Sequence, residues 1–127
     1  MKFQQALAEF PSKEASALDA YREVVKRLQS GTLNRASAAL QIEYVIVPQW
    51  DKLCDSIGAP KLAENSQRAD MQHGLTLYCD SRRRHFHLVS VALQTGDAQT
   101  EKEAAEALKR VQAQIEVIKR IAKNPSR

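Results

Sequence analysis

Residues 100–123 read TEKEAAEALKRVQAQIEVIKRIAK, and apolar side chains recur in this stretch at alternating spacings of four and three. This spacing gathers the apolar side chains on one face of an α-helix and leaves the charged ones on the other. Thr100 and Glu103 have the spacing of a capping box, which predicts that the helix begins at Thr100. The predicted apolar face consists of Ala104, Leu108, Val111, Ile115, Ile118 and Ala122.

The same helical period continues toward the N-terminus and divides the chain into further helices. Gly31, Gly58 and Gly96 stand where these helices are expected to end, because Gly accepts the backbone conformation that follows a helix. Pro11 followed by Ser12 predicts a new helix start, so the residues before it are expected to form a separate amphipathic segment. The predicted elements are that segment over 1–11 and helices over 12–30, 33–57, 61–95 and 100–123, with Ser66 as the alternative start of the third helix.

Short connections between long helices favour antiparallel neighbours. The predicted fold is therefore all-α, a single-domain antiparallel up-down four-helix bundle over residues 1–127. Pro48 lies inside the second helix and crowds the carbonyl of Tyr44, which predicts a kink between them. The β-branched run 45–47 would also suit a strand, but the helical stripe continues on both sides of it.

Composition narrows the classes of protein that the chain can form. Its 127 residues are 43% hydrophobic, enough for one buried core, and only 4 Gly and 4 Pro argue against collagenous or turn-rich folds. The longest apolar run, residues 44–48, is far too short to span a membrane, and no apolar signal-peptide core follows Met1. We expect a cytoplasmic protein by default, with an extracytoplasmic location as the alternative.

Two opposite charges interrupt apolar helix faces and form the main structural prediction. Glu43 breaks the stripe of the second helix and Arg82 that of the third. A turn centred near residue 62 would bring the two level with each other, and the hydroxyl of Tyr21 would come level with Glu43. We therefore expect a buried structural ion pair, whose removal by Glu43→Ala would cost about 3 to 5 kcal/mol. Trp50 falls on the same apolar stripe and is expected in the core.

The cysteines and histidines give weaker signals. In the register expected for Glu43, Cys79 faces Ile46, about 12 Å from Cys54, so no disulfide is predicted. Neither thiol has a His one helical turn away, and no catalytic residue is assigned. His73, Asp80 and His87 recur every seven residues, too far apart along one helix to bind one metal ion, so no metal site and no cofactor are predicted.

The sequence also predicts a helix face rich in basic residues. The net charge is +4, but glutamates interleave with the bases and no aromatic residue stands beside them, which argues against nucleic-acid binding. A solvated face is the favoured interpretation, and a nucleic-acid interface is the alternative. The residues concerned are Arg83, Arg84, Lys109, Arg110, Lys119, Arg120 and Lys123.

One family resemblance adds to these observations. The set Ile42-Glu43, Val47-Pro48 and Trp50, followed by Tyr78 with Arg82 one turn later, resembles an uncharacterised helical module of proteobacterial proteins that often stands beside a rhomboid-type protease domain. The likeness covers about residues 18–121, and its most specific part is the Ile-Glu, Pro, Trp set. Ser81 stands where the pattern usually has Leu, and the rhomboid catalytic motifs are missing. The resemblance implies an accessory domain with Glu43, Pro48, Trp50, Tyr78 and Arg82 as its framework.

The predicted function is a non-enzymatic interaction or accessory module. We expect the partner to be an unidentified protein. A homodimer is the alternative if apolar helix faces stay uncovered. Two alternatives stand beside it, nucleic-acid binding through the basic face and a small-molecule or metal site near Glu43 and Pro48.

Overall fold

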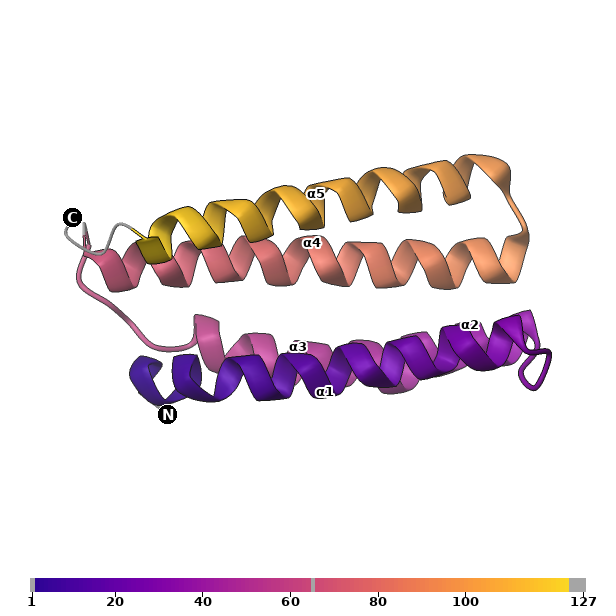
Figure 1. The fold of residues 1–127 in the computed structure, drawn as a ribbon, viewed down its shortest axis with the longest axis horizontal. Coiled ribbons are helices and arrows are strands. Elements are labelled where there is room, and N and C mark those ends of the chain that lie inside the picture. The colour runs from indigo at the N-terminus through magenta and orange to yellow at the C-terminus, as the bar shows by residue number, and fades with distance from the viewer. Residues whose placement is uncertain (1, 65, 124–127) are drawn as a thin grey trace.

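The computed structural model describes residues 2–64 and 66–123, and in that part all regular structure is helical. α2, the π-helical turn η1 and α3 follow one another without a break, so the chain forms four rods (Figure 1). The predicted all-helical bundle is confirmed for these residues. The elements are α1 (Phe3–Gln29), α2 (Arg35–Gln41), η1 (Ile42–Ile46), α3 (Val47–Gly58), α4 (Gln67–Thr95) and α5 (Ala98–Lys123).

The first helix is longer than predicted. α1 runs through Pro11 without interruption, so the separate segment over 1–11 and the helix start at Ser12 are wrong. Phe3 and Phe10 are buried in the core, and their burial offsets the roughly 3 kcal/mol that a proline costs inside a helix. Pro11 itself is exposed, so its ring lies against solvent.

The second rod contains a π-helical turn where the sequence predicted a disturbance. Residues Ile42–Ile46 form this turn immediately before the helix that contains Pro48. Proline has no backbone N–H for the carbonyl one turn earlier, and the wider π turn is a common way to accommodate such a lost bond. Ile42 and Ile46 are buried while Tyr44 and Val45 are exposed, so the run is an amphipathic helix and the strand alternative is wrong.

Capping side chains fix where the last two helices begin. Ser66 accepts a hydrogen bond from the Ala69 N–H at 3.0 Å and starts α4 at Gln67, so of the two predicted starts the one at Ser66 is right and the one at Lys61 is wrong. Asp97 accepts bonds from the N–H and the hydroxyl of Thr100, which hold the pKa of Asp97 below its usual value. α5 therefore begins at Ala98, and the capping box at Thr100 is wrong because Asp97 already supplies the acceptor.

The four rods pack in sequence but do not close into a ring. α4 packs along α5, and the α2–α3 rod packs against both α1 and α4. Gly74 is buried on α4, where a Cβ atom would lie only 3.1 Å from Cδ1 of Ile121, so its missing side chain lets α5 approach closely. Among the described residues, no Cα atom of α1 lies within 8 Å of a Cα atom of α4 or α5. Side chains of α1 still reach α4, where Phe10 packs on Tyr78 and Tyr21 on Phe86, so the open side of the bundle lies between α1 and α5.

None of the helices within residues 2–64 and 66–123 has a stretch both long and apolar enough to span a bilayer.

Candidate ligand-binding groove

The predicted pair of Glu43 and Arg82 does not form. The Glu43 carboxylate lies 2.7 Å from Nδ1 of His87, and this contact is an ion pair only when the imidazole is protonated. The prediction failed because it assumed a tight turn near residue 62. The connection from Ala59 to Ser66 lets α4 start late, and α4 is displaced along α3 by more than one helical turn from the assumed register.

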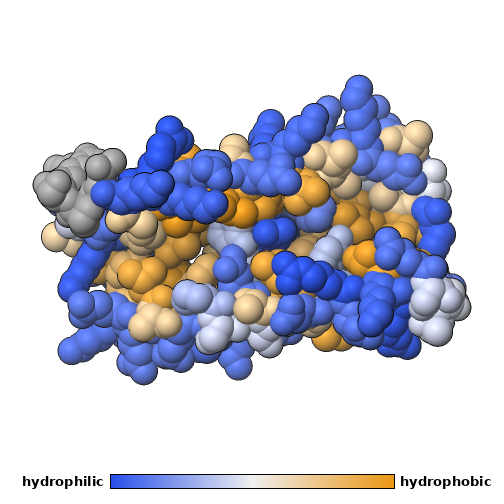
Figure 2. Space-filling model, viewed as in Figure 1, coloured by the Kyte–Doolittle hydropathy of each residue, from blue (hydrophilic) through white to orange (hydrophobic). Residues whose placement is uncertain are grey.

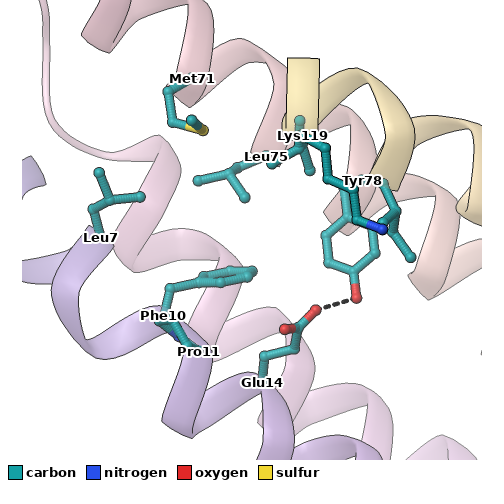
Figure 3. Close-up of a pocket in the computed structure, with 10 residues that line it drawn as sticks. Leu7, Phe10, Pro11, Glu14, Met71, Leu75, Tyr78 and Lys119 are labelled. Atoms are coloured by element: carbon teal, nitrogen blue, oxygen red, sulfur yellow. Dashed lines mark hydrogen bonds between the residues drawn. The ribbon is translucent and has the colours of Figure 1, made fainter. Parts of the chain in front are cut away.

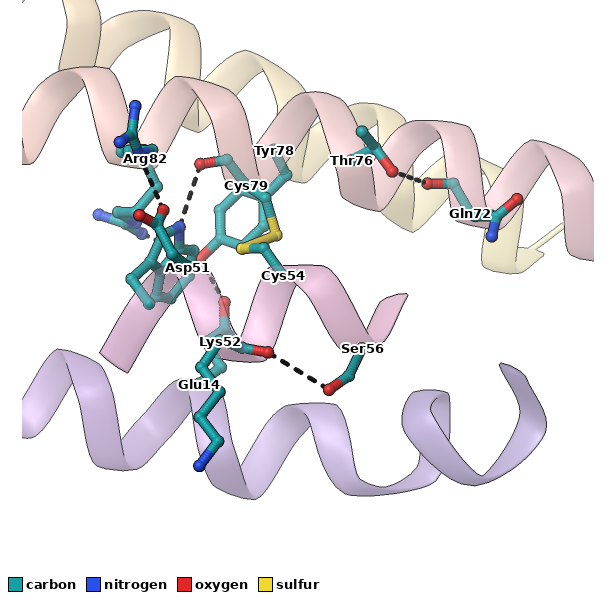
Figure 4. The surroundings of a disulfide bond; sticks show 12 residues. Glu14, Asp51, Lys52, Cys54, Ser56, Gln72, Thr76, Tyr78, Cys79 and Arg82 are labelled. Atoms are coloured by element: carbon teal, nitrogen blue, oxygen red, sulfur yellow. Dashed lines mark hydrogen bonds and ion pairs between the residues drawn. A yellow bond between two sulfur atoms is a disulfide. The ribbon is translucent and has the colours of Figure 1, made fainter. Parts of the chain in front are cut away.

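The same displacement creates a disulfide that the sequence argument excluded. Cys54 and Cys79 are bonded, with their Cα atoms 5.9 Å apart, and the bond joins α3 to α4 (Figure 4). The indole N–H of Trp50 donates to the Cys79 carbonyl at 3.0 Å in the buried interior. Both contacts fix the same level of α4 against α3, so the prediction that Cys79 faces Ile46 is wrong.

Besides Glu43 and Arg82, three residues were predicted to form the framework, of which two lie in the core and one does not. Trp50 is fully buried, and its ring makes edge contacts with Tyr78 and Phe86 at centroid distances of 5.7 and 5.8 Å. Tyr78 is 2% exposed, whereas Pro48 is exposed to solvent. The aromatic cluster, rather than an ion pair, occupies the middle of the bundle.

Arg82 belongs to a network that links α4 to α1. Its Nη2 donates to the Tyr78 hydroxyl at 3.2 Å, and that hydroxyl donates to the Glu14 carboxylate (Figure 3). Burial, reinforced by the Glu14 contact, raises the pKa of Tyr78 to about 12, so the phenol keeps its proton and acts as a donor. Among the described residues, Arg82 is therefore joined to a carboxylate only through a neutral hydroxyl.

Glu14 was missed in the sequence, although a signal for it existed. Phe3, Leu7 and Phe10 continue in the four-three alternation to Glu14 and then to Leu18. The helix break predicted at Pro11 separated the apolar residues before it from Glu14. Glu14 was therefore not identified as an acidic residue on an apolar helix face. An uninterrupted helix would have shown a charge on an apolar face of α1, as was recognised for Glu43 and Arg82.

Tyr21 does not meet Glu43, but it does lie beside Arg82. Its ring packs on His85 and Phe86 at centroid distances of 6.1 and 4.8 Å. Burial raises the pKa of Tyr21, and the nearby Arg82 charge partly opposes this shift. His85 is 6% exposed, and burial together with Arg82 lowers its pKa to about 4, so its imidazole is neutral at pH 7.

The open side of the bundle carries one hollow with mainly apolar walls and a second with mixed apolar and basic walls, which together we call the α1–α5 groove. Figure 2 shows patches of apolar side chains along the band between α1 and the α4–α5 pair, with hydrophilic side chains on both borders and across the middle of the band. The first hollow, of about 280 Å³, is drawn in Figure 3, and the second, of about 360 Å³, contains Tyr21. The first is lined by Leu7, Phe10, Pro11, Glu14, Met71, Leu75, Tyr78, Ile115, Ile118 and Lys119, and the second by Leu18, Tyr21, Arg22, Val25, Lys26, Gln29, Arg82, His85 and Leu108.

Neither hollow of this groove includes Glu43 or Pro48, around which the sequence placed an alternative small-molecule or metal site. His73, Asp80 and His87 are all exposed, and His87 is engaged with Glu43. In the part of the chain that the structure describes, no three His, Cys, Asp or Glu side chains are grouped so as to hold a metal ion.

The basic residues named from the sequence are all exposed, and two of them have acidic partners. Arg83 binds Asp51 at 2.8 Å, and Lys119 lies 3.4 Å from Glu116. These pairs reduce the charge offered to a polyanion. The remaining members of the set are Arg84, Lys109, Arg110, Arg120 and Lys123.

Comparison with known proteins adds no relative: no protein-family model, curated protein or solved structure matches the chain. The resemblance to the rhomboid-associated module therefore stays a prediction from sequence.

Proposed function

We propose that this chain is a non-enzymatic binding module, and that the α1–α5 groove receives an acidic amphipathic helix of a partner protein. The observation that carries the proposal is the open fourth side of the bundle. A closed four-helix bundle would cover the apolar side chains of this side by packing α1 on α5. Here a partner helix would take the place of that missing contact.

The shape of the groove favours a rod-shaped ligand. Residues of α1 from Leu7 to Gln29 line its two hollows in succession, which corresponds to about 30 Å along a helix axis. Apolar residues of α5 at 108, 115 and 118 face the same opening. Binding of an amphipathic helix in such a groove is a recurring mode of peptide recognition.

The charges favour an acidic ligand at one of the two hollows, since the first is lined by both Glu14 and Lys119. The hollow that contains Tyr21 is lined by Arg22, Lys26 and Arg82 and by no acidic residue. Asp19 neutralises Arg22 at 2.9 Å, but within the described residues no carboxylate lies within ion-pair distance of Lys26 or Arg82. Acidic side chains on the partner helix would complement these two cations. A second copy of this chain, whose net charge is +4, would not complement these cations in the same way.

The proposal includes the architecture of the chain as one domain, an antiparallel up-down bundle with a bend at Pro48. The very short connection between Thr95 and Ala98 supports opposite directions for α4 and α5, and Figure 1 draws successive rods running back and forth. Support for the bend comes from the π turn before Pro48, since long helices commonly bend at such turns.

The proposal also places the protein in an oxidising, extracytoplasmic compartment, which was the alternative in the sequence analysis. The Cys54–Cys79 disulfide supports it, because disulfides persist in such compartments and are rare in the cytosol. The disulfide also supports a non-enzymatic role, since both thiols are oxidised and neither offers a thiolate nucleophile.

The test uses a synthetic 18-residue amphipathic helix with leucines on one face and glutamates beside them, and a control peptide with lysines in place of the glutamates. We expect the acidic peptide to shift backbone NMR signals of α1 and α5 residues that line the groove. Lys26→Glu should weaken its binding at least tenfold, whereas Lys102→Glu, an exposed change on α5 outside the two hollows, should not.

Signals that shift elsewhere, or equal binding of both peptides, would contradict the proposal. Light scattering of the free protein provides a second measurement. A stable dimer that the acidic peptide does not dissociate would show that a second copy covers the groove.

A further inference from the structure

Three polar side chains from α1 and α4 meet in one hollow of the groove, and their arrangement is not explained by packing alone. Tyr21 comes from α1, while Arg82 and His85 come from successive turns of α4. All three line the cavity of about 360 Å³, whose other walls include the apolar side chains of Leu18 and Leu108. We call this cavity the Tyr21 pocket.

Two nitrogen atoms of this pocket's residues have no hydrogen-bond partner. They are Nε of Arg82 and Nδ1 of His85, and both are buried. A buried polar atom left unpaired costs free energy, so native proteins rarely retain one without a reason. The two atoms lie one turn apart on α4 and belong to side chains that line the same cavity, which indicates that an acceptor is missing.

The charge of the pocket also indicates that an acceptor is missing. Within the described residues, Arg82 has no carboxylate within 4 Å, and its only hydrogen bond goes to the neutral hydroxyl of Tyr78. The neutral imidazole of His85 can donate from Nδ1 in one tautomer. The guanidinium of Arg82 and the neutral donor of His85 together match one carboxylate, and the cations Arg22 and Lys26 line the same pocket.

We infer that the Tyr21 pocket is a carboxylate-binding site, which receives the side chain of a Glu or Asp residue on the docked partner helix. The inference rests on the proposed function and deepens it. The carboxylate accepts from Nε and a terminal nitrogen of Arg82 in the paired geometry that guanidinium favours, and from Nδ1 of His85. Leu18 and Leu108 pack against the methylene groups of the same side chain. The pocket thus fixes the register of the helix in the groove.

The pocket also has the donors and walls that discriminate a carboxylate from an amide. An amide in the same place would turn one N–H group toward Arg82 and lose the charge interaction. Tyr21 adds a protonated hydroxyl, because burial keeps its pKa above the usual value. A Glu side chain is therefore expected to bind more tightly than its isostere Gln.

The experiment compares two versions of the acidic peptide, identical except for Glu or Gln at the central position, by fluorescence anisotropy. We expect the wild-type protein to prefer the Glu peptide at least tenfold. Arg82→Gln and His85→Phe should each reduce this preference to about twofold or less. Arg84→Gln, an exposed change on the same helix, is the matched control and should keep it.

The outcomes separate the inference from the proposed function. Tight binding of both peptides without preference would overturn the carboxylate site and leave the groove function standing. Failure of both peptides to bind would overturn the proposed function. Free hexanoate tests the source of the carboxylate: if it shifts NMR signals of Tyr21 and His85 at concentrations where the Glu peptide does not bind, the ligand is a small molecule and the partner helix is excluded.

If Arg82→Gln fails to fold, Arg82→Lys keeps the charge but removes the paired geometry. This variant should lower the preference for Glu while retaining peptide binding. An unchanged preference in Arg82→Lys and in His85→Phe would overturn the inference.

Discussion

The carboxylate of Glu43 lies 2.7 Å from the Nδ1 atom of His87, on the α4 turn beyond the one that carries Arg82. This contact is partly open to solvent, since the side chains of Glu43 and His87 are 25% and 61% exposed. Arg82 instead belongs to the network with Tyr78 and Glu14. The acidic and basic side chains that interrupt apolar helix faces thus have separate partners, with different consequences for stability.

The first prediction concerns Glu43. Because its partner is exposed, Glu43→Ala should lower the free energy of unfolding by less than about 1 kcal/mol, not by the larger amount expected for a buried pair. Urea denaturation measures the change. A double-mutant cycle with His87→Gln should give a coupling energy of similar size, and a loss of several kcal/mol would show that the carboxylate is buried against a charge.

The second prediction concerns the hydroxyl of Tyr78. Tyr78→Phe leaves the Glu14 carboxylate and Nη2 of Arg82 without their shared partner in a partly buried setting, so it should cost about 1 to 3 kcal/mol. Tyr44→Phe is the matched control, because Tyr44 is 74% exposed, and it should change stability by no more than about 0.5 kcal/mol. Equal effects of the two substitutions would contradict the network.

The third prediction concerns the disulfide. Replacing Cys54 and Cys79 together by Ser should lower the free energy of unfolding by about 3 kcal/mol, since the bond closes a loop across 25 positions of sequence. A reductant should lower the denaturation midpoint of the wild-type protein and leave that of the double variant unchanged. Alkylation followed by mass spectrometry checks the bond directly: two reactive thiols in unfolded, non-reduced protein would disprove it.

The fourth prediction concerns pH. The pKa of His85 falls from 6.5 to about 4 on folding, so between these values the unfolded chain binds a proton that the folded chain does not. The free energy of unfolding should therefore decrease as the pH falls from 7 toward 5, with a contribution from His85 of at most about 1.4 kcal/mol per pH unit. Denaturation curves of His85→Gln should lose this component, whereas the exposed His73→Gln should retain it.

Helical content was predictable because it depends on local signals. The spacing of apolar residues predicted α5, and the Gly residues after α1 and α4 predicted where these two helices end to within one residue. The start of α1 was placed nine residues too late, at Ser12 instead of Phe3. Gly31 and Gly96 have φ angles of 80° and 66°, the left-handed conformation that Gly adopts readily. The start of α5 was misassigned by two residues, because Thr100 and Asp97 both suit a helix start and only their contact distinguishes them.

The relative level of α3 and α4 could not be predicted in the same way. The sequence shows which residues face the core, but any displacement by a whole turn preserves those faces. A displacement of five to eight residues exchanges the partner of Glu43 from Arg82 to His87 and brings Cys79 from the level of Ile46 to Cys54. A tight turn centred near residue 62 would give one register. The connection from Ala59 to Ser66 is eight residues long and gives another.

The sequence by itself thus determined that this chain is helical, which face of each helix is apolar, and which side chains are out of place on those faces. Only the tertiary structure decided which of these side chains meet, that α1 stays apart from α5, and that Tyr21, Arg82 and His85 share a cavity. The physical reason is that a helix forms from interactions within a few residues. Its register against a neighbour depends instead on loop path and packing across the whole chain.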